Sequence, residues 1–160
     1  MVLNNRFNKI ILLMVLFLGM CVPLAYAQKQ PIRWRCVAQM TSPTDGVVTV
    51  KALIADGWHL YGLTMPEGGP KATAISLGSS TGVKFIGELT PDRKPLVKRD
   101  AIFDMDVNYW EQRVEFTYKF KITGSDPKIS GSVSYMGCND ETCLPPSTAS
   151  LSAPIVPLKK

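Results

Sequence analysis

Alternation of apolar and polar residues with a period of two is the feature that most constrains the fold of this chain. The clearest case is the run 114–122, whose apolar positions are Val114, Phe116, Tyr118, Phe120 and Ile122. The residues between them are charged or hydroxylated. This pattern predicts a half-buried antiparallel strand, with one face on a core and the other in solvent.

The same alternation recurs along most of the chain. It predicts a first strand that places Ile32, Trp34, Cys36 and Ala38 on its apolar face. Further strands are expected at residues 47–55, 58–63, 72–77, 83–86, 129–136 and 149–156. Short segments rich in Gly, Pro, Asp and Ser separate these runs, and no long segment shows the 3.6-residue period of a helix. The pattern predicts an all-β fold, an immunoglobulin-like antiparallel β-sandwich, with the polar stretch Gly87–Trp110 as a long loop.

The N-terminus has the composition of a secretory signal peptide. Arg6 and Lys9 precede an apolar run at residues 10–22, and Ala25-Tyr26-Ala27 resembles a cleavage site. We therefore expect residues 1–27 to be cleaved, leaving residues 28–160 as one exported domain without stable membrane insertion. The formal net charge is +5, with both signs scattered and no nucleic-acid motif, so no nucleic-acid partner is expected.

Four residues separate the last two cysteines, Cys138 and Cys143. In the chain-entropy model so small a ring stabilises a fold by only about 2 kcal/mol, against ~4–5 kcal/mol for a hundred residues. The pair is therefore a poor staple, and we interpret it first as a redox-active dithiol of a thiol–disulfide oxidoreductase. An inert stapling disulfide in a non-catalytic interaction module is the alternative.

The surroundings of the pair predict its reactivity. The cysteines should lie at the neck of a hairpin-like loop on the rim of the sandwich, exposed to partner proteins. Asp140 and Glu141 lie between them, and negative charge raises a thiol pKa. No basic residue is expected beside the sulfurs. The dithiol should therefore be a sluggish nucleophile that works as a relay with an activated partner.

Four stretches resemble one known family, the N-terminal periplasmic domain of the thiol:disulfide interchange protein DsbD. They are Gly57–Tyr61, Pro66–Pro70, Phe103–Phe120 and Tyr135–Pro146, which includes both cysteines and the Pro-Pro that follows. They occur in the family's order and span most of the expected mature chain. The resemblance implies an immunoglobulin-like sandwich whose two cysteines carry electrons in the periplasm.

The resemblance also implies roles and partners. Cys143 would form the mixed disulfide, and Cys138 would resolve it. His59 and Tyr61 would flank the site, and Phe103 is the candidate aromatic cap. The electron donor would be a thioredoxin-like domain or membrane reductase, and the acceptors would be periplasmic proteins with disulfides. Family members continue into a membrane domain and a thioredoxin-like domain, so a chain ending at Lys160 should find these partners on separate chains.

Other side chains leave further interpretations open. A soft-metal site, for Cu(I), could draw on Met136, Cys138, Cys143 and His59. A Cys–His hydrolase ranks far lower, because no motif for an oxyanion site accompanies the pair. Cys36 is expected to pack as a buried free thiol. The redox hypothesis itself requires no cofactor and no metal.

Overall fold

The computed structural model describes residues 30–158, so the predicted signal peptide lies outside the described residues. Those residues contain no helix that is long and apolar enough to cross a membrane. They form twelve strands: β1 (Ile32–Met40), β2 (Asp45–Ile54), β3 (His59–Tyr61), β4 (Ala74–Ser76), β5 (Val83–Pro91), β6 (Leu96–Asp100), β7 (Met105–Trp110), β8 (Arg113–Ile122), β9 (Ile129–Tyr135), β10 (Gly137–Cys138), β11 (Ser147–Ala153) and β12 (Ile155–Val156).

A five-stranded sheet in the order β12-β1-β2-β8-β5 forms one layer. Its central strands are antiparallel, and β12 pairs with β1 in parallel. The alternation in the sequence maps onto its two faces as predicted. Val114, Phe116 and Phe120 of β8 are buried, whereas Lys119 and Lys121 are exposed. The all-β prediction is confirmed, and every predicted strand overlaps a strand of the structure.

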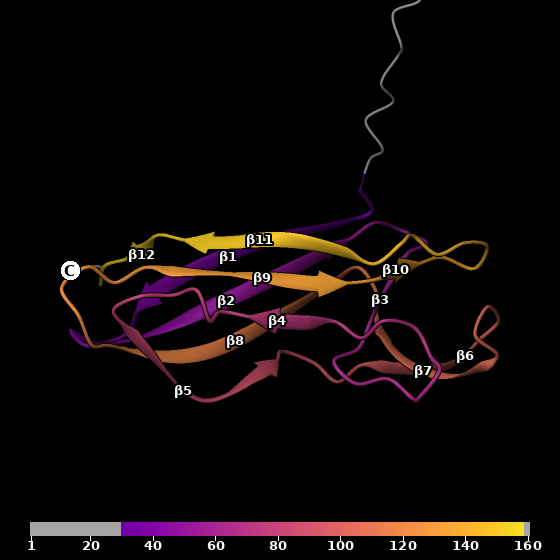
Figure 1. The fold of residues 1–160 in the computed structure, drawn as a ribbon, viewed down its shortest axis with the longest axis horizontal. Helices are drawn as coiled ribbons and strands as arrows, with labels where there is room; N and C mark the ends of the chain where they lie inside the picture. The colour runs from indigo at the N-terminus through magenta and orange to yellow at the C-terminus, as the bar shows by residue number, and fades with distance from the viewer. Residues whose placement is uncertain (1–29, 159–160) are drawn as a thin grey trace, which may run out of the picture.

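A three-stranded antiparallel sheet in the order β11-β9-β4 forms the second layer. In Figure 1 it lies in front of β1, β2 and β8. Apolar side chains from both layers meet in one core, which includes Val50 of β2, Phe116 of β8, Val133 of β9 and Leu151 of β11. Two sheets packed over a shared apolar core make the sandwich that the sequence predicted.

A four-stranded sheet in the order β10-β3-β7-β6 forms the end of the molecule opposite β12 (Figure 1). The prediction of a long loop at Gly87–Trp110 is wrong here, because this stretch contains the end of β5 and the whole β6–β7 hairpin. Leu96 and Val97 of β6 are exposed, and β6 is an edge strand. A strand with so little buried surface lacks the apolar alternation by which sequence analysis finds strands.

Candidate functional site

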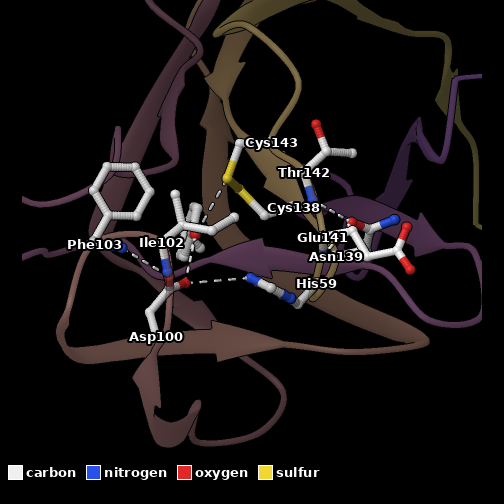
Figure 2. The surroundings of a disulfide bond; sticks show 10 residues. His59, Asp100, Ile102, Phe103, Cys138, Asn139, Glu141, Thr142 and Cys143 are labelled. Carbon is white, nitrogen blue, oxygen red and sulfur yellow. Dashed lines mark hydrogen bonds and ion pairs between the residues drawn. A yellow bond between two sulfur atoms is a disulfide. The ribbon is translucent and has the colours of Figure 1, made fainter.

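Cys138 and Cys143 form a disulfide within the four-stranded end of the sandwich (Figure 2). Cys138 is the last residue of β10 and lies opposite His59 of β3. The two cysteines also form an isolated antiparallel bridge, with Cα atoms 4.1 Å apart. The predicted hairpin-like loop is therefore present, and the disulfide closes its neck.

Hydrogen bonds hold the loop between the sulfurs in a tight turn. The Asn139 side-chain oxygen accepts hydrogen bonds from the backbone N–H groups of Glu141 and Thr142, at 3.0 and 2.7 Å. The Asn139 N–H donates to the Thr142 carbonyl oxygen, and the Leu144 N–H donates to the Gly137 carbonyl oxygen, both at 2.9 Å. An Asn side chain bonded to the backbone two residues on is an Asx turn. Asp140 and Glu141 are exposed at its tip.

The two sulfurs differ in exposure. Cys138 is fully buried, whereas Cys143 is half-buried. The expectation that both cysteines would be exposed on the rim is therefore wrong for Cys138. Its position in a strand that pairs with β3 covers it from one side. Of the two cysteines, Cys143 is therefore the more accessible to solvent.

A small apolar cluster, separate from the main core, surrounds the disulfide. Its members come from β3, β7, β10 and the loops beside them: Tyr61, Val107, Tyr109 and Cys138 are buried, and Met65, Phe103, Met105, Met136 and Cys143 pack against them. Phe103 lies in the turn between β6 and β7. Its ring meets that of Tyr61 edge-on, with centroids 6.1 Å apart. The structure thus brings Tyr61 and Phe103 to the cysteines.

Tyr61 connects the disulfide to a buried carboxylate that sequence analysis missed. Its hydroxyl donates a hydrogen bond of 2.7 Å to Oδ2 of Asp100 and lies 3.8 Å from Sγ of Cys143. Oδ1 of Asp100 accepts hydrogen bonds from the backbone N–H groups of Ile102 and Phe103, at 2.9 and 3.1 Å (Figure 2). Asp100 therefore fixes both the tyrosine and the turn that carries Phe103.

These contacts determine the charge of the network. Burial by itself raises the pKa of Asp100, but the hydrogen bonds from Tyr61, Phe103 and Ile102 outweigh burial and hold the pKa below its ordinary value. Burial, together with the hydrogen bond to Asp100, raises the pKa of Tyr61. At neutral pH the site therefore contains an Asp100 carboxylate and a neutral Tyr61 hydroxyl.

His59 lies beside this network and is deeply buried. It is 3 % exposed, and its ring meets those of Tyr61 and Tyr109 edge-on. Nε2 lies 3.8 Å from Oδ2 of Asp100 and has no hydrogen-bond partner within the described part of the chain. Burial and the positive charge of Lys98 lower the pKa of His59 despite the nearby carboxylates. The imidazole is therefore neutral at pH 7, and its contact with Asp100 is not an ion pair.

A basic residue does lie beside the cysteine loop, contrary to the sequence-based expectation. Lys98 of β6 forms an ion pair with Asp140, with Nζ 3.2 Å from Oδ1. Its Nζ also lies 5.1 Å from the centroid of the Tyr109 ring. The Asp140 side chain is 90 % exposed, so solvent screens the pair and its contribution to stability is small. Lys98, His59, Asp100 and Asp140 line a cavity of about 150 Å³ between the β6–β7 turn and the cysteine loop.

Two further predictions concern metal ligands and Cys36. Residues 30–158 contain no cluster of three or more His, Cys, Asp or Glu side chains that could hold a metal ion. His59 directs Nε2 toward Asp100, so the soft-metal alternative depends on Met136 and the reduced cysteines. Cys36 is a half-buried free thiol beside the main core, and burial raises its pKa to about 11. It lies outside the cluster around the disulfide.

One solved structure shares this architecture. The N-terminal periplasmic domain of ScsB from Proteus mirabilis has a similar fold, with a TM-score of 0.57 and 21% sequence identity. That similarity covers 81% of this chain and 48% of the ScsB chain, so this protein spans about half of that chain. The reduced DsbD N-terminal domain of Neisseria meningitidis aligns with a TM-score of 0.43 and 18% identity, over 74% of this chain and 82% of that one. The search of curated proteins found no match.

A family model supplies the assignment. Residues 30–154 match the family described as thiol:disulfide interchange protein DsbD, N-terminal. This match covers nearly all of the described residues and includes both cysteines of the disulfide. A disulfide pair in such a domain fits a thiol–disulfide oxidoreductase. The chain therefore belongs to the family of DsbD N-terminal domains, which are thiol–disulfide interchange modules.

Proposed function

We propose that the Cys138–Cys143 pair relays electrons from a thioredoxin-like donor to periplasmic proteins that carry disulfides. The observation that carries the proposal is the unequal burial of the two cysteines, which lie in the same apolar cluster as Phe103. A relay needs one sulfur that a partner reaches and a neighbouring sulfur that resolves the mixed disulfide. Cys143 has the exposure for the first role and Cys138 the shelter for the second.

The pair is first reduced by the donor and then reduces the acceptor, and both reactions take place at Sγ of Cys143. A donor thiolate attacks Sγ of Cys143, the Cys138–Cys143 bond breaks, and Cys138 leaves with the electron pair and takes up a proton. The donor's second thiolate then attacks the donor sulfur that is bonded to Cys143. The donor disulfide forms, and Cys143 leaves as a thiolate. The reduced pair passes its electrons on when Cys143 attacks an acceptor disulfide and Cys138 resolves the resulting bond.

The network beside Cys143 favours its protonated thiol. Tyr61 donates its hydroxyl hydrogen to Asp100, so its oxygen presents lone pairs to Sγ of Cys143. An oxygen acceptor and a nearby carboxylate both stabilise a thiol relative to a thiolate. Burial has the same effect on Cys138. The reduced pair therefore reacts slowly with small oxidants, and a docked partner that displaces Phe103 and activates Cys143 selects the productive exchange.

Cellular location and processing belong to the same proposal. Cleavage after Ala27 would release residues 28–160 into the periplasm, where disulfides persist. Mass spectrometry of protein recovered from a periplasmic fraction tests this proposal, with Gln28 as the expected first residue. Full-length protein retained in the membrane fraction would contradict it.

Trapping of the mixed disulfide tests the roles of the sulfurs. Cys138→Ser should form a covalent complex through Cys143 with an oxidised thioredoxin-like domain, because the variant lacks the Cys138 thiol that would resolve the mixed disulfide. Cys143→Ser is the matched control and should trap little, since Cys138 is buried. A non-reducing gel shows the complex, and mass spectrometry identifies the linked peptides. Trapping through Cys138 would reverse the roles, and no trapping by either variant would contradict the relay.

The reduction potential separates a relay from a staple. Structural disulfides of secreted proteins have potentials below about −300 mV, whereas exchange-active pairs are more easily reduced. Equilibration with dithiothreitol of known redox ratio should place the Cys138–Cys143 pair above that limit. A potential well below it would identify a stapling disulfide.

A further inference from the structure

Basic side chains gather on the outer face of the five-stranded sheet, although they are dispersed in the sequence. Alternate residues of β1, β2, β5 and β8 point away from the core, and the pairing of the strands aligns them. We call this surface the basic face. Within these strands its charged residues are seven basic (Arg33, Arg35, Lys51, Lys84, Arg113, Lys119 and Lys121) and three acidic (Asp45, Glu88 and Glu115). A fourth carboxylate, Asp92, follows β5 and accepts a hydrogen bond from the Glu115 N–H at the edge of the face.

The excess of basic over acidic residues is confined to this face and does not extend to residues 30–158 as a whole. Residues 30–158 contain 13 Lys and Arg and 13 Asp and Glu, so they carry no net charge when His59 is neutral. The positive surplus on the basic face is therefore balanced by acidic groups elsewhere. Two of these groups, Asp140 and Glu141, lie in the loop between the two cysteines. Charge is therefore distributed unevenly over the domain, with a positive surplus on the basic face.

Most of the basic groups on this face are available to a ligand. Lys51 forms an ion pair of 2.7 Å with Glu115, and Arg113 lies 4.0 Å from the same carboxylate. The other five (Arg33, Arg35, Lys84, Lys119 and Lys121) form no ion pair within residues 30–158. Exposed apolar side chains accompany them on the outward side: Val37 is 51 %, Ile86 46 % and Val156 41 % exposed.

We propose that the basic face binds the anionic headgroups of a membrane surface without insertion into the bilayer. Lys and Arg near an anionic leaflet are attracted to it, and exposed apolar side chains add contact with the interface. The basic groups are spread over four paired strands, which suits an extended charged surface. Single-stranded nucleic acids bind where aromatic side chains stack on bases, and the outward positions of these strands carry none.

This orientation leaves the disulfide free. The cysteine loop lies at the end of the sandwich that carries β10 and β6, not on the outer face of the five-stranded sheet (Figure 1). If the basic face lies on the membrane, the end that carries Cys143 points along the membrane surface. Partners that are themselves anchored in the membrane could then reach it.

Vesicle binding tests the proposal. The protein used is residues 28–160, which retains the whole described sandwich and lacks the apolar run at residues 10–22 that would bind lipid by itself. It should co-sediment with vesicles of equal phosphatidylcholine and phosphatidylglycerol, less so as salt increases, and not with vesicles of phosphatidylcholine alone.

A matched pair of triple variants locates the binding surface. Arg35→Gln, Lys119→Gln and Lys121→Gln together should weaken binding at low salt roughly a hundredfold, since each basic group near an anionic surface contributes about fivefold. The control is Lys71→Gln, Arg99→Gln and Lys128→Gln, which changes the net charge equally outside the basic face and should bind like the unsubstituted protein. Circular dichroism checks that both variants keep the fold.

Three outcomes would overturn the proposal. The first is the absence of binding to phosphatidylglycerol vesicles at low salt. The second is an equal loss in the two triple variants, which would show a response to net charge alone. The third is binding of soluble polyglutamate by the basic face without vesicle binding, which would identify an acidic protein as the partner.

Discussion

Replacing Tyr61 by Phe removes one oxygen from the network beside the disulfide and keeps the ring in place. In the unsubstituted protein the buried hydroxyl donates to Oδ2 of Asp100 at 2.7 Å. The variant leaves that oxygen without its donor, while Oδ1 keeps the N–H groups of Ile102 and Phe103. Asp100 is only 3 % exposed, so the oxygen that loses its donor is buried.

The size of the effect follows from the charge on the acceptor. A hydrogen bond to an ionised group contributes about 1.5–3 kcal/mol, and a buried acceptor that loses its partner incurs a loss of this size. We therefore expect Tyr61→Phe to lower the free energy of unfolding at pH 7 by ~2 kcal/mol. The apolar cluster keeps its packing, because Phe occupies the same space.

The effect should depend on pH in a defined direction. The hydrogen bonds hold the pKa of folded Asp100 below its ordinary value, despite burial, which raises it. This depressed pKa stabilises the fold above the unfolded value of about 3.9, and the stabilisation is lost as pH falls through the lower, folded value. The difference between the two proteins should be constant from neutral pH to about pH 5. Below about pH 4 it should fall toward ~1 kcal/mol, the contribution of a neutral hydrogen bond.

Urea denaturation of the oxidised proteins, followed by tryptophan fluorescence, measures the difference at pH 7, 5 and 3. Tyr109→Phe is the matched control. Tyr109 lies in the same cluster and is 7 % exposed, but its hydroxyl forms no hydrogen bond within residues 30–158. The control should lose far less stability than Tyr61→Phe. Equal losses in the two variants, or a difference that does not change between pH 7 and pH 3, would refute the reasoning.

Three further predictions concern the reactivity of the thiols. Phe103→Ala should speed reduction of the disulfide by dithiothreitol while circular dichroism stays the same, and an unchanged rate would place the shield elsewhere. Asp100→Asn removes a buried negative charge, so the pH profile for alkylation of reduced Cys143 should shift to lower pH; an unshifted profile would contradict the inhibitory role of Asp100. Cys36, with a pKa of about 11, should react slowly with iodoacetamide at pH 8 and about tenfold faster per pH unit above it, as mass spectrometry can show; fast labelling at pH 8 would mean that the thiol is not buried.

Some of the site could be predicted from local sequence. The spacing of Cys138 and Cys143 indicated a small disulfide ring, and the structure contains it. His59 and Tyr61 were placed beside the cysteines by family resemblance, and β3 does place them there. Phe103 was a candidate cap at the end of a supposed loop. It lies instead in the turn of a hairpin, but it does contact the cluster around the disulfide.

Asp100 could not be found in this way. It follows Lys98 and Arg99 in a polar stretch, where an acidic residue gives no sign of burial. Only the pairing of β6 with β7, and of β7 with β3, places its carboxylate under the Tyr61 hydroxyl, 39 residues away in the chain. One possible signal was its position just before the Ala-Ile-Phe turn, where an Asp side chain commonly accepts hydrogen bonds from the backbone that follows.

The sequence by itself determined the strands of the two packed sheets, because alternation is a local property that a half-buried strand carries in its own residues, but it did not determine the β6–β7 hairpin. Only the tertiary structure decided which strands pair, and therefore which distant side chains meet. The burial of Cys138, the contact between Tyr61 and Asp100, and the alignment of Arg35, Lys51 and Lys119 on one face all follow from that pairing. The burial of a side chain and the charge around it depend on residues in neighbouring strands. A single stretch of sequence does not specify which strands those are.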